Sequence, residues 1–173
     1  VDHIVFDKTG TLTLGRLELA NTEDISAKQL TMAAALARAS RHPISRAVVE
    51  AAGPGQVAGN VREVAGFGLE SGPADQPVRF GSAAFTGGKG DYDQPTAWLK
   101  ADKGAPSLFL FDDTLRPGAA ALVAWLKADG IAVSMLSGDT APAAARIAAR
   151  TGIADWHAPL SPADKIVRLD AMA

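Results

Sequence analysis

Cysteine is absent from the 173-residue sequence. This absence excludes disulfides, thiolate metal sites and cysteine nucleophiles together, and it leaves the redox compartment open. Long apolar runs are also missing, because stretches such as residues 31–37 are far shorter than the roughly 20 residues of a membrane-spanning helix. Lysine and arginine do not cluster and the formal net charge is −2 at pH 7, so the sequence indicates no nucleic-acid partner.

The composition is that of a globular protein. Hydrophobic residues make up 47% of the chain and charged residues 21%, which argues against disorder. The length allows one large domain or two small ones. The sequence opens on strand-like residues without an initiator methionine or a signal-peptide pattern and closes inside a helical pattern, so we expect a soluble piece of a longer protein.

Both ends of the chain alternate between apolar strands and helices. The expected elements are strands at 1–6, 16–20, 107–111, 131–136 and near Trp156, and helices at 117–129, 140–151 and from 162. The continuous apolar run 107–111 is typical of a fully buried parallel strand. This alternation predicts an α/β fold with a doubly wound parallel sheet, formed by residues 1–21 and 101–173.

The middle of the chain lacks this alternation of strands and helices. Helices are expected at 26–40 and 43–52, followed by a glycine- and proline-rich stretch, 53–90, that contains short β-like runs. Residues 22–100 are therefore predicted to form an inserted α+β domain with an antiparallel sheet.

Three polar clusters follow apolar strands. They are Asp7-Lys8-Thr9, Asp112-Asp113 and Ser137-Gly138-Asp139. Open α/β sheets bind ligands at the carboxyl ends of their strands, where a rigidly held carboxylate can attack phosphorus if a metal and a lysine balance its charge. A hydroxyl and a glycine N–H can hold phosphoryl oxygens, and Lys165 would add positive charge. Taken singly, each cluster could instead be a surface turn.

The stretch from Asp7 to Thr13 reads DKTGTLT and resembles the phosphorylation motif of P-type ATPases, within the haloacid dehalogenase superfamily. The resemblance implies that Asp7 is the nucleophile that forms an aspartyl phosphate, with Lys8 beside it in the catalytic motif. It further implies that Mg²⁺ is bound by Asp7 and the Thr9 carbonyl, and that Thr11 touches the phosphoryl group.

Three later segments extend this resemblance. Ser137-Gly138-Asp139 resembles the family's TGD, with the hydroxyl kept, and these three residues join the catalytic set. Pro162, Asp164 and Lys165 resemble its P-x-D-K segment, which implies that Lys165 lies near the phosphate. The stretch Asp112 to Arg116 resembles D-x-x-L-R/K, and Asp113 leaves its register open.

The residue two positions after Asp7 separates the subfamilies. Phosphatases of the superfamily carry a second Asp there as a general acid and base, which speeds hydrolysis of the aspartyl phosphate, whereas this chain has Thr9. The sequence therefore favours an ATPase over a phosphatase with a cap domain.

His42-Pro43 resembles the SEHPL motif of the heavy-metal (type IB) branch of P-type ATPases. The resemblance implies a nucleotide site in which His42 and Pro43 lie near adenine and Gly66, Gly68 and Gly81 allow a close backbone approach. Three positions depart from the pattern, namely Ala37, Arg41 and Ser82. Each lost polar contact costs about 1 kcal/mol, so we expect ATP binding to be weak.

As a whole, the resemblance implies the ATP-binding and phosphorylation unit of a heavy-metal-transporting P-type ATPase, most often a copper transporter. ATP and Mg²⁺ would be its cofactors, and its partners would be the membrane and actuator domains of the same parent chain and a transported metal ion bound outside this chain. The location would be the cytoplasmic side of a bacterial inner membrane. Since the family's GDGxND segment is absent, we expect little autophosphorylation of this piece. A catalytically silent nucleotide-binding module remains the other alternative.

Overall fold

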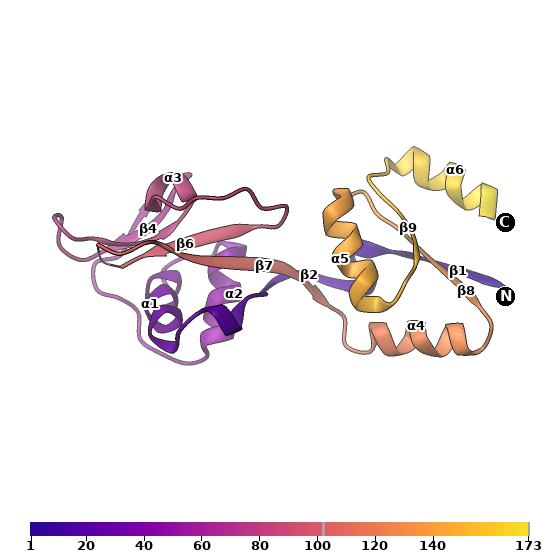
Figure 1. Ribbon diagram of the computed structural model, residues 1–173, viewed down its shortest axis with the longest axis horizontal. Coiled ribbons are helices and arrows are strands. Elements are labelled where there is room, and N and C mark those ends of the chain that lie inside the picture. Colours follow the sequence, from indigo (N-terminus) through magenta and orange to yellow (C-terminus); the bar gives the residue numbers. More distant parts are fainter. Residues whose placement is uncertain (102, 173) are drawn as a thin grey trace. The chain divides into compact units, whose positions relative to one another are not determined.

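The computed structural model describes residues 1–101 and 103–172, and the chain divides into two compact units (Figure 1). Unit 1 comprises Val1–Gly15 and Asp113–Ala173, and unit 2 comprises Arg16–Asp112. The chain passes from one unit to the other within β2 (Thr13–Leu19) and returns within β7 (Ser107–Leu115).

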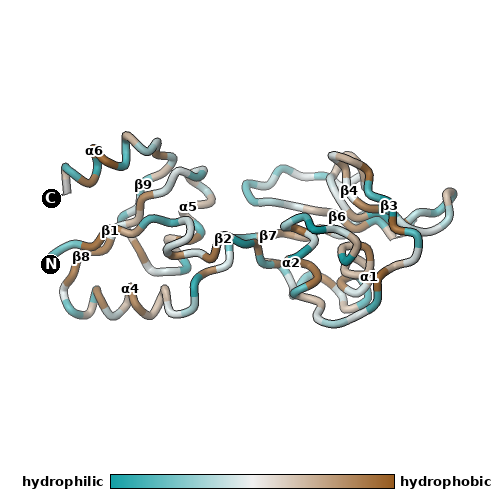
Figure 2. Tube along the Cα trace, turned by 180° about the vertical axis from the view of Figure 1, so that it is seen from behind, coloured by the Kyte–Doolittle hydropathy of each residue, from teal (hydrophilic) through white to brown (hydrophobic). Residues whose placement is uncertain are grey.

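Unit 1 is built on a parallel sheet in the order β1-β8-β9. Its strands are β1 (His3–Asp7), β8 (Ala132–Leu136) and β9 (Asp155–His157), and its helices are α4 (Ala119–Ala128), α5 (Ala141–Thr151) and α6 (Pro162–Met172). Both views place α4 and α6 on opposite sides of the strands, and Figure 2 shows that β1 and β8 are largely hydrophobic. The predicted α/β class with a parallel sheet is confirmed.

Unit 2 contains an antiparallel sheet from β3 through β7. Its other strands are β3 (Arg62–Val64), β4 (Gly68–Ser71), β5 (Val78–Gly81) and β6 (Thr96–Lys100), and β2 lies beside β7 in the same sheet. Helices α1 (Ala27–Ala37) and α2 (Pro43–Ala52) cover one face of the sheet, and the short α3 (Ala83–Thr86) lies on the other (Figure 1).

Each unit has its own hydrophobic core. Met135, Ile147 and Val123 are fully buried in unit 1, whereas Phe109, Phe111 and neighbouring side chains fill the core of unit 2. Local signals fix the helix starts. Ser26 forms a capping box with Gln29 at α1, and this arrangement satisfies backbone donors that a helix start otherwise leaves unpaired.

One sequence expectation was wrong. The run 107–111 was predicted to be a buried parallel strand, but β7 runs antiparallel to β6, with Phe109 opposite Ala97. Only alternate residues, Phe109 and Phe111, are fully buried, while Leu108 and Leu110 are half-buried. The strand therefore has one buried face and one half-buried face, as antiparallel strands commonly do. The continuous apolar run does not show this difference.

No helix in the described part of the chain is both long enough and apolar enough to span a membrane.

Candidate active site

The strand register of unit 1 brings the polar clusters to one edge of the sheet. Asp7, the last residue of β1, lies opposite Leu136, the last residue of β8. The Ser137-Gly138-Asp139 turn therefore leaves the sheet beside Asp7. The Asp7 side chain is 43% exposed and its carboxylate contacts the ammonium group of Lys165 on α6. The structure thus gathers a reachable carboxylate, a lysine and the Ser137 turn.

Lys8 points away from solvent. Its side chain is 3% exposed, and its ammonium group forms ion pairs with both Asp113 and Asp139. Burial alone would lower the pKa of Lys8, but hydrogen bonds and charge interactions with the two carboxylates outweigh it and raise the pKa above 10.5. Lys8, which directly follows β1, is therefore a cation that links Asp113 within β7 to Asp139 in the turn after β8. Asp113 is the residue that meets Lys8, so the geometry gives it a place in the site beside the sequence candidates.

The turn after Asp7, η1 (Lys8–Leu12), is held by the backbone and by one arginine. Gly10 adopts φ +77°, a left-handed conformation that glycine accepts without strain. The Arg116 guanidinium donates to the Gly10 carbonyl at 2.7 Å and to the Thr11 carbonyl at 2.9 Å. These bonds fix the loop on which Thr9 and Thr11 lie.

The Ser137 turn is equally constrained. Ser137 is buried, its N–H donates to the His157 carbonyl at 3.0 Å, and its carbonyl accepts from the Leu160 N–H at 2.9 Å. The Ser137 Oγ accepts from the Asp139 N–H at 3.1 Å. None of these bonds uses the Ser137 O–H proton, which leaves it to donate to an anion at the strand end.

The site suits Mg²⁺ only in a particular mode. Within the described residues, no group of three or more His, Asp or Glu side chains is arranged to hold a metal. Mg²⁺, however, commonly binds through one or two carboxylates together with substrate phosphates and water. All three carboxylates contact a lysine, but Asp7 is half-exposed and, within the described residues, contacts Lys165 through one oxygen, Oδ1, so its other oxygen fits that mode. Asp113 and Asp139 instead share the buried Lys8.

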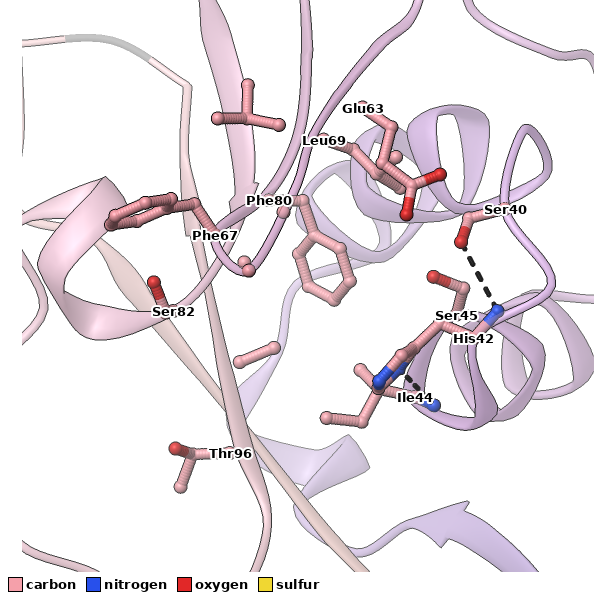
Figure 3. Close-up of a pocket in the computed structure, with 15 residues that line it drawn as sticks. Ser40, His42, Ile44, Ser45, Glu63, Phe67, Leu69, Phe80, Ser82 and Thr96 are labelled. Atoms are coloured by element: carbon pink, nitrogen blue, oxygen red, sulfur yellow. Dashed lines mark hydrogen bonds between the residues drawn. The ribbon is translucent and has the colours of Figure 1, made fainter.

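Unit 2 contains a pocket of about 270 Å³. Four predicted nucleotide residues line it, namely His42, Gly66, Gly68 and Gly81. Figure 3 shows Phe67 and Ser82 on the side of α3, His42 and Ser45 on the side of α2, and the Phe80 ring between them. Pro43 is not among the lining residues and instead begins α2 directly after its N-cap, His42.

Two of the pocket glycines are required by packing. Gly68 and Gly81 lie opposite each other on β4 and β5. A Cβ on Gly81 would lie 2.1 Å from the Phe67 carbonyl oxygen, and one on Gly68 would lie 2.3 Å from the Phe80 carbonyl oxygen. Any larger residue would force these strands apart. The two glycines therefore allow β4 and β5 to lie close together at this wall of the pocket.

The His42 ring has a defined hydrogen-bonding role. Its Nδ1 accepts from the Ile44 N–H at 3.3 Å, and the His42 N–H donates to the Ser40 hydroxyl at 3.2 Å. When the ring is neutral, its proton must therefore be on Nε2, which makes Nε2 a donor.

A family model of haloacid dehalogenase-like hydrolases matches residues 1–169. The chain belongs to this family. It is also 42% identical to "Nitrogen fixation protein FixI" of Rhizobium meliloti over 169 residues, which is 96% of this chain and 22% of the relative. It is 31% identical to a "Copper-transporting ATPase" of Helicobacter felis over 177 residues, which is 96% of this chain and 24% of that protein.

Solved structures agree with the family. A zinc-transporting PIB-type ATPase in its E2.Pi state matches with a TM-score of 0.79 and 29% identity, over 100% of this chain and 32% of that one. The catalytic domain of the CPx-ATPase CopB-B matches with a TM-score of 0.65 and 25% identity, over 99% and 68%. The resemblance to P-type ATPases is thereby confirmed. The chain spans about a quarter of the length of these curated relatives.

Some features of this haloacid dehalogenase-like chain escaped sequence reasoning. Glu63 and Phe67 line the pocket, and Ser82, on the same side as Phe67 (Figure 3), has an Oγ that is buried without a hydrogen-bond partner among the described residues. The Glu63 carboxylate could not be found from the sequence because its position depends on strand register.

Two of the positions that depart from the family pattern lie outside the pocket lining. Ala37 is fully buried in the core of unit 2, and Arg41 is exposed and does not line the pocket.

Proposed function

We propose that this chain is the ATP-binding and phosphorylation unit of a heavy-metal-transporting P-type ATPase. Unit 1 is the phosphorylation domain and unit 2 the nucleotide-binding domain. The proposal rests above all on Asp7, a half-exposed carboxylate at the carboxyl end of β1 that contacts Lys165 and begins the DKTGTLT stretch. The names of the relatives, which include a copper-transporting ATPase and a zinc-transporting PIB-type ATPase, support it.

In the proposed reaction, an Asp7 carboxylate oxygen attacks the γ-phosphorus of ATP. A bond forms between that oxygen and phosphorus, the bond from phosphorus to the β–γ bridging oxygen breaks, and ADP leaves with the electron pair. The Lys165 ammonium and the Ser137 O–H stabilise the charge on the transferring phosphoryl oxygens, together with the Gly138 backbone N–H, since the N–H groups of Ser137 and Asp139 already donate within the protein.

Other residues position these groups. Lys8 holds Asp113 and Asp139, and Arg116 fixes the loop that carries Thr9 and Thr11. Mg²⁺, when bound by Asp7 and the Thr9 carbonyl, supplies charge neutralisation to the phosphate.

The nucleotide base occupies the pocket of unit 2. His42 offers its Nε2 proton or its ring face. Gly68 and Gly81 allow β4 and β5 to lie close together, and Gly66 adopts φ +77° between β3 and β4. Pro43 contributes by starting α2, and so by fixing His42 at the helix end. Ser82 also lines the pocket, and its Oγ has no hydrogen-bond partner in the described part of the chain.

Dephosphorylation distinguishes a pump from a phosphatase. A carboxylate two residues after the nucleophile would activate water, and this chain has Thr9 there. The aspartyl phosphate is therefore long-lived, as a transport cycle requires. In the whole protein, membrane and actuator domains would use it to move a heavy-metal ion, for which copper is proposed because of the copper-transporting relative, with this part on the cytoplasmic side of a bacterial inner membrane.

The test is phosphorylation of the whole protein by γ-labelled ATP. Asp7→Asn removes the nucleophilic oxygen, and we expect labelling and metal-dependent ATP turnover to fall at least 100-fold, because the phosphoryl group then has no acceptor. The matched control is Asp129→Asn, on the exposed end of α4, which should label normally. Hydroxylamine-sensitive label that persists in Asp7→Asn would contradict the proposal.

A further inference from the structure

We propose that Glu63 is a specificity-determining residue of the unit 2 pocket, which accepts a hydrogen bond from the exocyclic amino group of adenine. This inference rests on the proposed nucleotide-binding function and adds the residue that selects the base.

The alternation of β3 directs Glu63 toward the pocket. Glu63 pairs with Leu69, and Leu69 pairs with Phe80, so the three residues form a row across β3, β4 and β5 on one face of the sheet. All three line the pocket. Glu63 is exposed, whereas Leu69 and Phe80 are almost fully buried, so the carboxylate lies at the outer end of this row.

The neighbouring charge on β3 behaves differently. Arg62 projects to the opposite face, where it forms an ion pair with Glu70, and Glu70 in turn contacts Arg79 at 3.2 Å. Within the described residues, the Glu63 side chain has neither an ion pair nor a hydrogen bond, although Figure 3 shows it at the pocket beside Ser40. Of the two adjacent charged residues, Arg62 is paired on the opposite face, whereas Glu63, unpaired within the described residues, faces the pocket.

The chemistry of the lining decides which part of a nucleotide meets Glu63. Glu63 is the only Asp, Glu, Lys or Arg among the lining residues of this described pocket. A carboxylate repels a triphosphate and can only accept hydrogen bonds, so the phosphates lie away from it and a hydrogen-bond donor of the base or the ribose lies beside it. The 6-amino group of adenine is such a donor, whereas an unsubstituted purine carries none at that position.

The test compares two ligands that differ only in that amino group. ATP and purine riboside triphosphate, which is ATP without the 6-amino group, are titrated calorimetrically into the whole 173-residue chain and its variants. A hydrogen bond to a charged but exposed acceptor predicts about 5- to 10-fold tighter binding of ATP by the wild type. Glu63→Ala should bind both ligands equally. Phosphate repulsion cancels in this ratio because both ligands carry the same triphosphate.

Two control variants test whether the preference for ATP comes from the Glu63 carboxylate. Glu63→Gln keeps an acceptor oxygen and should retain part of the preference, and Glu23→Ala, an exposed carboxylate outside the pocket, should retain all of it. An unchanged preference in Glu63→Ala would overturn the inference, as would a wild type that binds both ligands equally, and in both cases the nucleotide site itself would stand. A wild type that binds neither ligand would overturn the proposed nucleotide pocket as well.

Discussion

At the scale of single residues, the charge balance of the unit 1 site depends on Lys8. Its buried ammonium group meets Asp113 and Asp139, and Lys165 meets Asp7, so three carboxylates face two lysines. Without Lys8, Asp113 and Asp139 would repel each other. The sequence resemblance placed Lys8 in the catalytic motif. In the structure, Lys8 holds two carboxylates together.

Replacement of Lys8 by methionine should therefore destabilise unit 1. We expect the free energy of unfolding to fall by about 2 kcal/mol, less than for a fully buried pair because both carboxylates are partly exposed to water. Urea unfolding measures the change. Lys127→Met, which loses only an exposed bond to the Gly152 carbonyl, should cost less. The double variant Lys8→Met/Asp113→Asn should recover part of the loss, and a double variant no more stable than Lys8→Met would contradict the electrostatic explanation.

At the scale of elements, polar side chains join the three strands of unit 1. The Ser134 hydroxyl on β8 donates to Asp155 on β9, and His3 Nε2 on β1 lies 2.6 Å from the same hydroxyl oxygen. Since the Ser134 proton goes to Asp155, His3 must donate through Nε2. His157 Nε2 lies 3.1 Å from the other Asp155 oxygen, and Arg168 contacts His157 at 3.0 Å.

This row makes the stability of unit 1 sensitive to acid. The hydrogen bond from Ser134, followed by interactions with His157, holds the pKa of Asp155 below its usual 3.8. A lowered folded-state pKa stabilises the fold at pH values above 3.8, and this contribution is lost as the pH falls through the folded value. Asp155→Asn should therefore be less stable than the wild type at pH 7 and should lose less stability on acidification.

Unfolding by urea at pH 7 and at pH 3 measures both quantities, and Asp129→Asn serves as the exposed control in the same unit. If Asp155→Asn lost as much stability between the two pH values as the wild type, the row would not carry the acid sensitivity.

The sequence predicted some of the elements and their pairing, but not all. Strand–helix alternation identified the parallel sheet of unit 1, because each element buries one face with its own period. The structure pairs β7 antiparallel with β6, the strand directly before it in the chain. The pairing of β7 was mispredicted because its continuous apolar run lacks the alternation that marks an antiparallel strand, and β6 was missed. Asp7 and Lys165 are 158 positions apart and were linked through motifs, whereas Glu63 required the register with Leu69.

At the scale of the whole molecule, the two units have separate hydrophobic cores. Every residue that lines the unit 2 pocket lies between Ser40 and Ala97, inside unit 2. Unit 2 is also continuous in sequence, and its end strands β2 and β7 are neighbours in one sheet. The long-range contacts that join these end strands, such as the bond from the Ala20 N–H to the Leu110 carbonyl, are made within the unit itself.

Residues 16–112 should accordingly fold and bind ATP when produced alone. We expect a cooperative thermal transition and a Kd within about threefold of that of the 173-residue chain, since the pocket and the core beneath it are retained. Circular dichroism and calorimetric titration measure the two properties, with the intact chain as the reference. The capped helix α1 and the β3–β7 sheet supply the buried surface, while the cut removes only the ends of β2 and β7. A non-cooperative transition, or affinity reduced more than tenfold, would mean that the pocket depends on unit 1.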